Sequence, residues 1–205
     1  FPVTEVFLVA SSKSSGKKIN FLGKEHTVEN LEKFDFSKVK IAFFAAGSSV
    51  AERWAPIAAK KTIVIDNSKF FRKDQQIPLI VPEVNSKELP KFKNKNIIAN
   101  ANCSVIPIVV ALKPLHDLYD VRRIVASTYQ SVSGAGKAGM DELLSQTREI
   151  LENKKVQSKN FTKQIAFNAI PHIDSFLENC STKEAQKNHD EIKKILDDKI
   201  NVTST

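Results

Sequence analysis

Short apolar segments alternate with helix-forming segments in the first half of this chain, and this alternation constrains the fold more than any other feature. A helix is expected through Trp54 to about Lys60, with Ser48 or Ser49 as its N-cap. Apolar runs predict five strands, at residues 3–10, 41–46, 62–66, 79–81 and 97–99. Strands that alternate with helices indicate a parallel, doubly wound sheet, so the expected fold class is α/β.

The second half predicts a different mixture of elements. Helices are expected at residues 103–118, 140–151 and 184–196, a strand at 121–129, and the start of another strand at Ile200 and Val202. Pro107 lies in the first turn of the first helix, where a missing N–H costs least, and Pro114 should bend or shorten its far end. The other two helices should carry apolar faces, formed by Met140, Leu143, Leu144, Thr147 and Leu151 and by Ile192, Ile195 and Leu196.

The triplet Asn102-Cys103-Ser104 lies between the fifth strand and the apolar helix that follows it. A thiol there would meet free backbone N–H groups at the positive end of a helix dipole, and both favour the nucleophilic thiolate. A small buried core cysteine is the commoner use of a free Cys and stays open as an alternative. Cys180 lies in a polar loop, and we expect no catalytic role for it.

A glycine-rich turn follows the strand that ends near Tyr129 and precedes a helix. Gly134, Gly136 and Gly139 would let the backbone approach a bulky ligand, and the following helix N-terminus favours an anion. Such a turn is weak support alone, since many strand-to-helix turns carry glycine. Together with Cys103, it suggests an enzyme that attacks a carbonyl and holds a phosphate-bearing cofactor nearby.

Composition limits the class of protein. With 41% hydrophobic and 26% charged residues, the chain is ordinary for a soluble globular protein, and no apolar run approaches the ~20 residues that cross a bilayer. Residues 1–10 lack the leader of a signal peptide, and two cysteines in 205 residues favour a reducing cytoplasm. The net charge is +8, but the lysines are spread out without interleaved aromatic residues. We therefore expect an anion-binding cleft, and no nucleic-acid, membrane or metal site.

The ends of the chain are unusual. It begins at Phe1, its only methionine is Met140, and it stops at Thr205 just as a strand pattern begins. We expect an internal piece of a longer protein.

Longer motifs surround the cysteine and the glycine-rich turn. They are AGSS at residues 46–49, VIDNS at 64–68, NCS at 102–104, ALKPLH at 111–116, STYQSVSGAGKAGMDEL at 127–143 and NAIPHID at 168–174. They extend over essentially the whole chain, which resembles bacterial aspartate-semialdehyde dehydrogenases. The resemblance implies a Rossmann-like NADP-binding domain at residues 1–101 and an α+β catalytic and dimerisation domain at 102–205. Both would be incomplete here, and the protein would be a homodimer.

The resemblance also implies a reaction. It is the reversible, NADP-dependent reductive dephosphorylation of L-aspartyl-4-phosphate to L-aspartate-4-semialdehyde, which serves lysine, threonine, methionine and diaminopimelate biosynthesis. By resemblance, Cys103 attacks the acyl carbon, phosphate leaves, and hydride reduces the thioester. N–H groups at the helix start would hold the oxyanion. Gln130 matches the glutamine that orients the substrate.

Substrate-binding residues follow from the same resemblance. Glu184 would pair with the substrate ammonium, while Lys187 and Arg72 would bind phosphate with help from Asn102. Without the resemblance, we would expect Glu184 and Lys187 to form a solvated i,i+3 ion pair. Arg72 would be expected to be an ordinary surface residue.

Cofactor binding is expected in three loops. The loops contain Ser11, Ser12, Lys13 and Ser14, then Ala46, Gly47 and Ser48, and then Ser133, Gly134 and Gly136. A cation and hydroxyl groups in the first loop suit an adenosine 2′-phosphate and so favour NADP over NAD.

The chain departs from the family pattern in several places. The first strand and its glycine-rich dinucleotide loop would precede Phe1, and the acid/base His and carboxylate-binding Arg would follow Thr205. The four histidines do not match the catalytic His motif; they are His26, His116, His172 and His189. Ala101 replaces a proline that often precedes Asn-Cys. These 205 residues alone would lack the catalytic base, and loss of a general base lowers the reaction rate about 10²–10⁴-fold. We therefore expect no useful activity from them.

Three alternatives stay open. N-acetyl-glutamyl-phosphate reductase uses the same cysteine chemistry, but the run at residues 130–136 and the Glu184–Lys187 pair argue against it. A non-catalytic dimerisation or regulatory module could keep the fold without a complete site. A nucleic-acid-binding role is more distant and would require salt-dependent binding.

Overall fold

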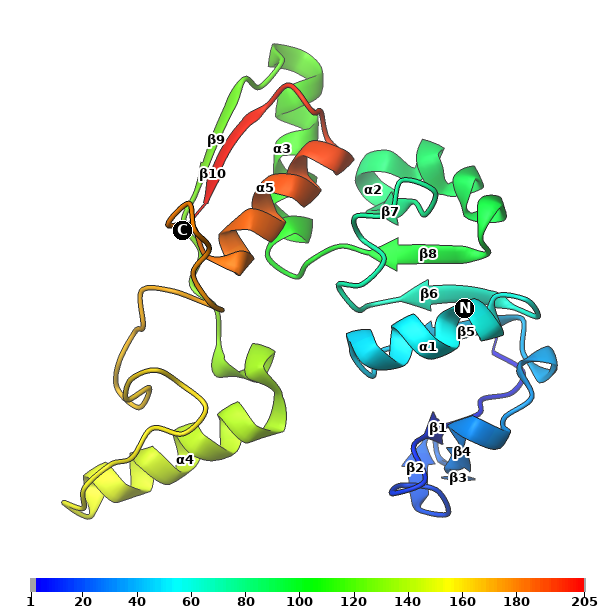
Figure 1. The fold of residues 1–205 in the computed structure, drawn as a ribbon, viewed down its shortest axis with the longest axis horizontal. Coiled ribbons are helices and arrows are strands. Elements are labelled where there is room, and N and C mark those ends of the chain that lie inside the picture. Colours follow the sequence, from blue (N-terminus) through cyan, green and yellow to red (C-terminus); the bar gives the residue numbers. More distant parts are fainter. Residues whose placement is uncertain (1–2, 205) are drawn as a thin grey trace.

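A four-stranded parallel sheet forms the centre of the first half of the molecule (Figure 1). The strands lie in the order β5 (Ile41–Phe44), β6 (Ile63–Asp66), β8 (Ile97–Asn100) and β7 (Leu79–Ile80). This computed structural model describes residues 3–204, so the predicted domain ends at Phe1 and Thr205 lie outside the described residues. The register pairs Phe44 with Asp66 and Asp66 with Ala99. The carboxyl ends of β5, β6 and β8 therefore meet at one edge, where residues 46–48, 67–72 and 102–104 follow them.

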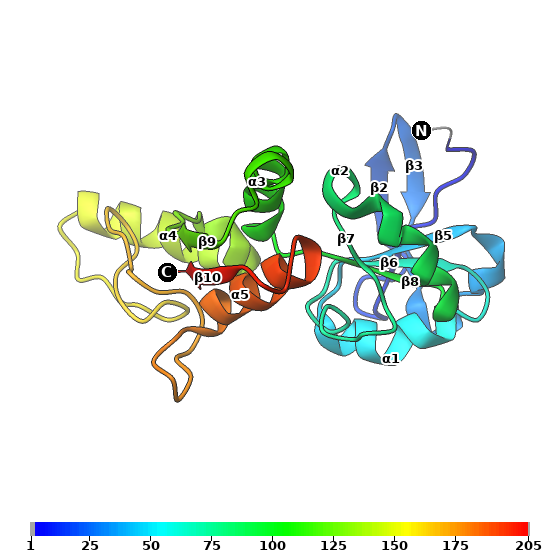
Figure 2. The same cartoon turned by 90° about the horizontal axis from the view of Figure 1, so that it is seen from above.

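Helices cover both faces of this sheet, which confirms the doubly wound prediction. Helix α1 (Ser48–Ala58) packs on β5 and β6 with its alanines buried. Figure 2 shows α2 (Pro82–Asn85) on the opposite side, where a 3-10 segment (Ser86–Asn94) continues it. The predicted N-cap was wrong: Ser48 and Ser49 both lie inside α1, and the cap is Gly47. Its φ of +88° is a conformation that favours glycine.

The N-terminal segment differs from its prediction. The expected buried strand at residues 3–10 is reduced to β1 (Val9–Ala10), which pairs in parallel with only the two residues of β4 (Glu29–Asn30). None of residues 3–10 is fully buried, because so short a partner strand leaves most of the apolar run unpaired. Between them lies a hairpin that the sequence analysis missed, formed by β2 (Lys18–Phe21) and β3 (Lys24–Thr27). Leu22 and Gly23 both have positive φ, as a type I′ turn requires.

In the second half, residues 105–204 form three α-helices and one small parallel sheet. They are α3 (Val105–Tyr119), β9 (Arg123–Ala126), α4 (Gly136–Leu151), α5 (Lys183–Ile195) and β10 (Asn201–Ser204), with β10 beside β9. The predicted stripe of Ile192, Ile195 and Leu196 packs into the core. Pro114 does not shorten α3, since it removes one backbone donor and the helix continues to a left-handed C-cap at Asp120.

The predicted apolar face of α4 was wrong. Met140, Leu144 and Leu151 are 45%, 51% and 72% exposed. The buried face instead carries Glu142 and Gln146, which accept hydrogen bonds from backbone N–H groups at residues 159, 160, 165 and 166. A long loop therefore covers α4 through polar contacts, while Met140, Leu144 and Leu151 stay exposed and Leu143 is only partly buried. Figure 1 shows this helix and loop together at one end of the molecule.

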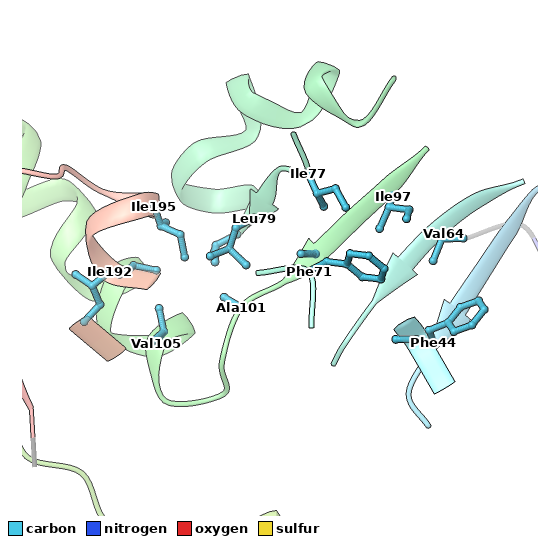
Figure 3. Close-up of a cluster of buried hydrophobic side chains, with 14 of the residues drawn as sticks. Phe44, Val64, Phe71, Ile77, Leu79, Ile97, Ala101, Val105, Ile192 and Ile195 are labelled. Atoms are coloured by element: carbon cyan, nitrogen blue, oxygen red, sulfur yellow. The ribbon is translucent and has the colours of Figure 1, made fainter. Parts of the chain in front are cut away.

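One hydrophobic core joins the two halves. In Figure 3, Phe44, Val64 and Ile97 of the main sheet lead through Leu79 to side chains of α3 and α5. Ala101 and Val105, which flank the cysteine turn, are 2% and 0% exposed. The turn at residues 102–104 is therefore fixed at both ends by buried residues.

Candidate active site

The turn that carries Cys103 lies between β8 and α3. Cys103 is exposed, and its thiol lies 3.5 Å from Oδ1 of Asn102. Helix α3 begins at Val105, two residues later than predicted. The sequence predicted free N–H groups here, but those of Ser104, Val105 and Ile106 donate to oxygens of Asn102. These three groups therefore stabilise the turn itself. The alternative of a buried core cysteine is wrong, because Cys103 is exposed.

Asn102 is the centre of a buried hydrogen-bond network. Its Nδ2 donates to Oε1 of Glu184 at 2.9 Å, and Nε2 of Gln130 reaches the same oxygen at 3.4 Å. The other oxygen of Glu184 accepts a hydrogen bond from Lys187 at 2.9 Å. Asn102 is 6% and Glu184 9% exposed. The structure thus brings together four predicted site residues that are widely separated in the sequence.

The Glu184–Lys187 pair is not the solvated pair that the residues alone suggested. Burial opposes ionisation of Glu184, but hydrogen bonds from Lys187 and Asn102 outweigh it and hold the pKa of Glu184 below its usual value. Burial likewise opposes the charge of Lys187, and the Glu184 and Asp174 carboxylates raise its pKa. Asp174 lies 3.2 Å from Nζ of Lys187. The pair is therefore a partly buried, charged group beside the cysteine turn.

Arg72 extends this network and is not a surface residue. Its side chain is 10% exposed, and Nη1 donates to Oε1 of Glu191 at 3.0 Å. Nη2 donates to the carbonyl of Asn67. Within residues 3–204, the buried Nε of Arg72 has no hydrogen-bond partner. An unmet donor on a buried cation fits the predicted role of binding an anion.

Two residues of α5 in this network were missed by the sequence analysis. Oε2 of Glu191 accepts the backbone N–H of Asn102 at 2.6 Å, and Oδ1 of Asn188 accepts from the hydroxyl of Ser104 at 2.7 Å. Both lie on the helix face of Glu184, at positions i+4 and i+7. That spacing was the available signal. We call Arg72, Asn102, Glu184, Lys187, Asn188 and Glu191 the Asn102 network.

The three predicted cofactor loops, at residues 11–14, 46–48 and 133–136, have a different character. Almost all of their residues are exposed, and only Ser14 and Ser48 are partly buried. The first two follow the carboxyl ends of β1 and β5. The third is a 3-10 turn (Val132–Ala135) that leads into α4. Their exposure and small side chains leave room for a bulky ligand.

The glycines of the third loop serve different purposes. Gly136 has φ +75°, whereas a Cβ at Gly134 would meet open space. A Cβ at Gly139 would lie 2.8 Å from that of Ala135 and 3.2 Å from Phe161. Gly139 is therefore required by packing inside the protein, and only Gly134 and Gly136 remain candidates for ligand approach.

Another group of polar residues lies at the far end of α3. Potential ligand atoms of His116, Asp120 and Asp197 all lie within 4.8 Å of one another. Arg122 pairs with Asp120, and His116 lies 3.9 Å from Asp197. The arginine already supplies a positive charge, so we assign the group to ion pairing. Among the described helices, none combines the length and apolar character needed to cross a membrane.

Comparison with known proteins connects this site to a family. Residues 1–92 match the family model for the semialdehyde dehydrogenase NAD binding domain, and residues 112–205 match that for the semialdehyde dehydrogenase dimerisation domain. The chain belongs to the semialdehyde dehydrogenase family. The two matched regions lie on either side of the cysteine turn, and neither of them includes it.

Individual relatives within this family are close. Aspartate-semialdehyde dehydrogenase 2 of Vibrio cholerae is 52% identical over 199 residues, which are 97% of this chain and 59% of the relative. Aspartate-semialdehyde dehydrogenase of Aquifex aeolicus is 49% identical over an alignment of 209 residues, which covers 100% of this chain and 62% of the relative. The chain therefore spans about 60% of the length of the relatives it matches.

Solved structures agree with the fold. The crystal structure of aspartate semialdehyde dehydrogenase II from Vibrio cholerae complexed with ASA has a TM-score of 0.97 at 51% identity, covering 100% of this chain and 62% of that one. A probable aspartate-semialdehyde dehydrogenase from Pseudomonas aeruginosa has a TM-score of 0.90 at 28% identity, with the same coverage. The α/β architecture is shared along the whole of this chain.

Proposed function

We propose that the full-length protein catalyses the reversible, NADP-dependent reductive dephosphorylation of L-aspartyl-4-phosphate to L-aspartate-4-semialdehyde. The observation that carries the proposal is the exposed thiol of Cys103, in a turn whose Asn102 is bonded to Glu184 and, through it, to Gln130 and Lys187. An accessible nucleophile beside buried charged groups suits a small, doubly charged acyl phosphate. The names of the relatives support the same reaction.

Different residues of the chain have different roles in the proposed reaction. Sγ of Cys103 bonds to the acyl carbon while the bond from that carbon to the phosphate oxygen breaks, and phosphate leaves. Lys187 and Arg72 bind the phosphate, and Glu184 binds the substrate ammonium. Gln130 orients the acyl group. When bound, NADPH would supply a hydride to the acyl carbon; the carbon–sulfur bond would then break, releasing the aldehyde and returning Cys103 as the thiolate.

Cofactor binding is proposed for the three exposed loops. Ser11, Ser12 and Ser14 offer hydroxyls and Lys13 a cation, a combination that fits a 2′-phosphate and favours NADP. The second loop contributes Ala46, Gly47 and Ser48, and the third contributes Ser133, Gly134 and Gly136. Both have the small side chains that allow a close approach of the backbone.

We propose a boundary between a cofactor domain and a catalytic domain at residues 101 and 102, and a homodimer formed by the second. Large apolar side chains are exposed there, including Leu118, Tyr119, Val125 and Leu151 at 63–77%. Apolar surface of this kind is commonly covered by a partner. In this proposal the protein acts in the cytoplasm, in the biosynthesis of lysine, threonine, methionine and diaminopimelate.

The test is an assay of the full-length protein with aspartate semialdehyde, inorganic phosphate and NADP. We expect NADP reduction that requires phosphate. Faster reaction with N-acetyl-glutamate semialdehyde would instead identify the reductase relative. A folded protein without activity on either aldehyde would favour the non-catalytic module and contradict the proposal.

A further inference from the structure

Glu191 is a buried carboxylate to which the proposed reaction assigns no role. It lies on α5, two turns after Glu184, and is 4% exposed. A buried carboxylate is costly unless donors or cations compensate for the water it has lost. The two donors that compensate for Glu191 come from two different segments of the chain, one after β6 and one after β8.

One carboxylate holds two otherwise separate parts of the chain. Oε1 accepts from Nη1 of Arg72 at 3.0 Å, and Oε2 accepts from the backbone N–H of Asn102 at 2.6 Å. Arg72 follows β6 in the first half of the chain, while Asn102 begins the cysteine turn. One oxygen of Glu191 therefore fixes the Arg72 guanidinium and the other fixes the Asn102 N–H. The rigid carboxylate group sets the distance between these two donors.

The charge of Glu191 acts on Arg72 as well. An anion that binds Arg72 meets a guanidinium already shared with a carboxylate at hydrogen-bond distance. Burial raises the pKa of Glu191, and the neighbouring Glu184 carboxylate adds to this, while Arg72 and the Asn102 N–H oppose it. The structure thus pairs the proposed phosphate-binding cation with a built-in competing anion.

We propose that Glu191 is a positioning residue with two separable effects: its reach fixes the cysteine turn through the Asn102 N–H, and its charge weakens phosphate binding at Arg72. The inference rests on the proposed function, since it takes phosphate as the anion. A site that must both accept and release phosphate in a reversible reaction gains from moderate affinity, because tight binding of a reactant or product does not raise turnover.

Two substitutions separate reach from charge. Glu191→Gln keeps the size but removes the charge, and it offers one acceptor oxygen where two donors are present. Glu191→Asp keeps the charge but is shorter by one methylene, so it no longer reaches both donors. Asp190→Asn is the matched control, because Asp190 is the adjacent α5 carboxylate and its partners Lys73, Gln186 and His189 are not members of the Asn102 network.

The experiment uses the full-length protein with Cys180→Ser, and alkylation is followed by mass spectrometry on the peptide that contains Cys103. Iodoacetamide alkylates Cys103 in the presence of increasing inorganic phosphate, and the half-protecting phosphate concentration is compared among variants. For Glu191→Gln we expect this concentration to fall about fivefold, as expected when a nearby like charge is removed. For Glu191→Asp and Asp190→Asn it should stay within about twofold of the parent.

Turnover reports the second effect. We expect kcat to fall at least about tenfold in both Glu191 variants, since small displacements of a nucleophile reduce the rate strongly. Asp190→Asn should retain the parent kcat within about twofold. A purely structural Glu191 would lower thermal stability alone, without tighter phosphate binding in Glu191→Gln.

Several results would overturn the inference. They are a parent protein that phosphate does not protect, a Glu191→Gln variant with unchanged or weaker phosphate protection, or a Glu191→Asp variant with the parent kcat. Should Glu191→Gln fail to fold, the kcat of Glu191→Asp decides the matter alone. Phosphate protection needs no hydride transfer, so an inactive parent would contradict the proposed function while the charge effect of Glu191 is still measured.

Discussion

The residues proposed to bind the substrate are buried or partly buried and are linked by hydrogen bonds, whereas those proposed to bind the cofactor lie mostly exposed in three separate loops. As whole residues, Arg72, Asn102 and Glu184 are each no more than 9% exposed. Residues of the cofactor loops make short-range contacts, such as the 2.6 Å contact between the Ser131 and Ser133 hydroxyls. The Asn102 network therefore has one arrangement that the fold enforces, while the loops can adjust to a ligand at little cost.

This difference shows how the chemistry can be distributed over the fold. The reacting sulfur needs a fixed position, and it lies between two fully packed residues, Ala101 and Val105. A large cofactor gains its binding energy from many weak contacts, which exposed loops can provide. Substitutions in the Asn102 network should accordingly impair stability and turnover, whereas substitutions in the loops should impair cofactor binding.

The largest effect is expected at the cysteine itself. Cys103→Ser should lower kcat by about 10³-fold or more, because a hydroxyl without an activating base is a poor nucleophile at neutral pH. Cys180→Ser is the matched control and should retain activity within about twofold, since Cys180 lies in an exposed turn elsewhere. Steady-state kinetics of the full-length protein provide the measurement. Retention of most of the rate in Cys103→Ser would exclude the proposed nucleophile.

The next prediction concerns stability. Asn188 is 1% exposed and links the Ser104 hydroxyl to that of Ser204. Asn188→Ala should lower the free energy of unfolding by about 2–3 kcal/mol, because it removes a buried side chain and its hydrogen bonds to both hydroxyls. Ser133→Ala in the third cofactor loop should change it by less than about 0.5 kcal/mol.

Urea unfolding of both variants measures this difference. Equal losses in the two proteins would show that the third loop is as firmly built into the fold as the Asn102 network. The contrast between the two regions would then be wrong.

A smaller effect is expected in the first cofactor loop. Lys13→Ala should reduce the preference for NADP over NAD about tenfold, since a charged hydrogen bond to phosphate is lost. Stability should remain as in the parent, because Lys13 is exposed. The ratio of kcat/KM values for the two cofactors is the measurement. If the preference for NADP over NAD does not change, this loop does not bind the 2′-phosphate.

The sequence predicted the fold well in the segments whose buried side chains are apolar. Strands β5, β6 and β8 and the stripe of α5 follow continuous or periodic apolar residues, and these predictions were confirmed. The hairpin of β2 and β3 was missed because nearly all of its side chains are exposed, so no burial pattern marks it. On α4 the apolar pattern predicted the wrong face. Two of the buried residues, Glu142 and Gln146, are polar, whereas three of the predicted apolar residues are exposed: Met140, Leu144 and Leu151.

The site was predictable in its parts but not in its connections. Resemblance pointed to Cys103, Gln130 and Glu184, and their roles stay predictions. What the sequence could not supply is that Asn102 contacts residues 82 and 89 positions away, since such contacts depend on how α5 docks beside the cysteine turn. Glu191 carries no local signature beyond its helical spacing from Glu184.

The smallest effect is expected in the pH dependence of stability. The pKa of Glu184 lies below its usual value because donated hydrogen bonds outweigh the burial that opposes them. Its carboxylate therefore stabilises the fold above the ordinary value of 4.5, and this stabilisation disappears as the pH falls through the lowered pKa. Because burial offsets part of the gain, the change should be modest.

Urea unfolding at a series of pH values from neutral to below 4.5 tests this. The parent should lose stability on acidification more steeply than Glu184→Gln, in which that proton-binding site is absent. Asp141→Asn, on the exposed face of α4 where Lys137 pairs with Asp141, is the control and should follow the parent, because an exposed ion pair contributes little. If instead Glu184→Gln follows the parent and Asp141→Asn departs from it, charge on the outer face of α4 matters more than the buried network, and the comparison between the two regions is reversed.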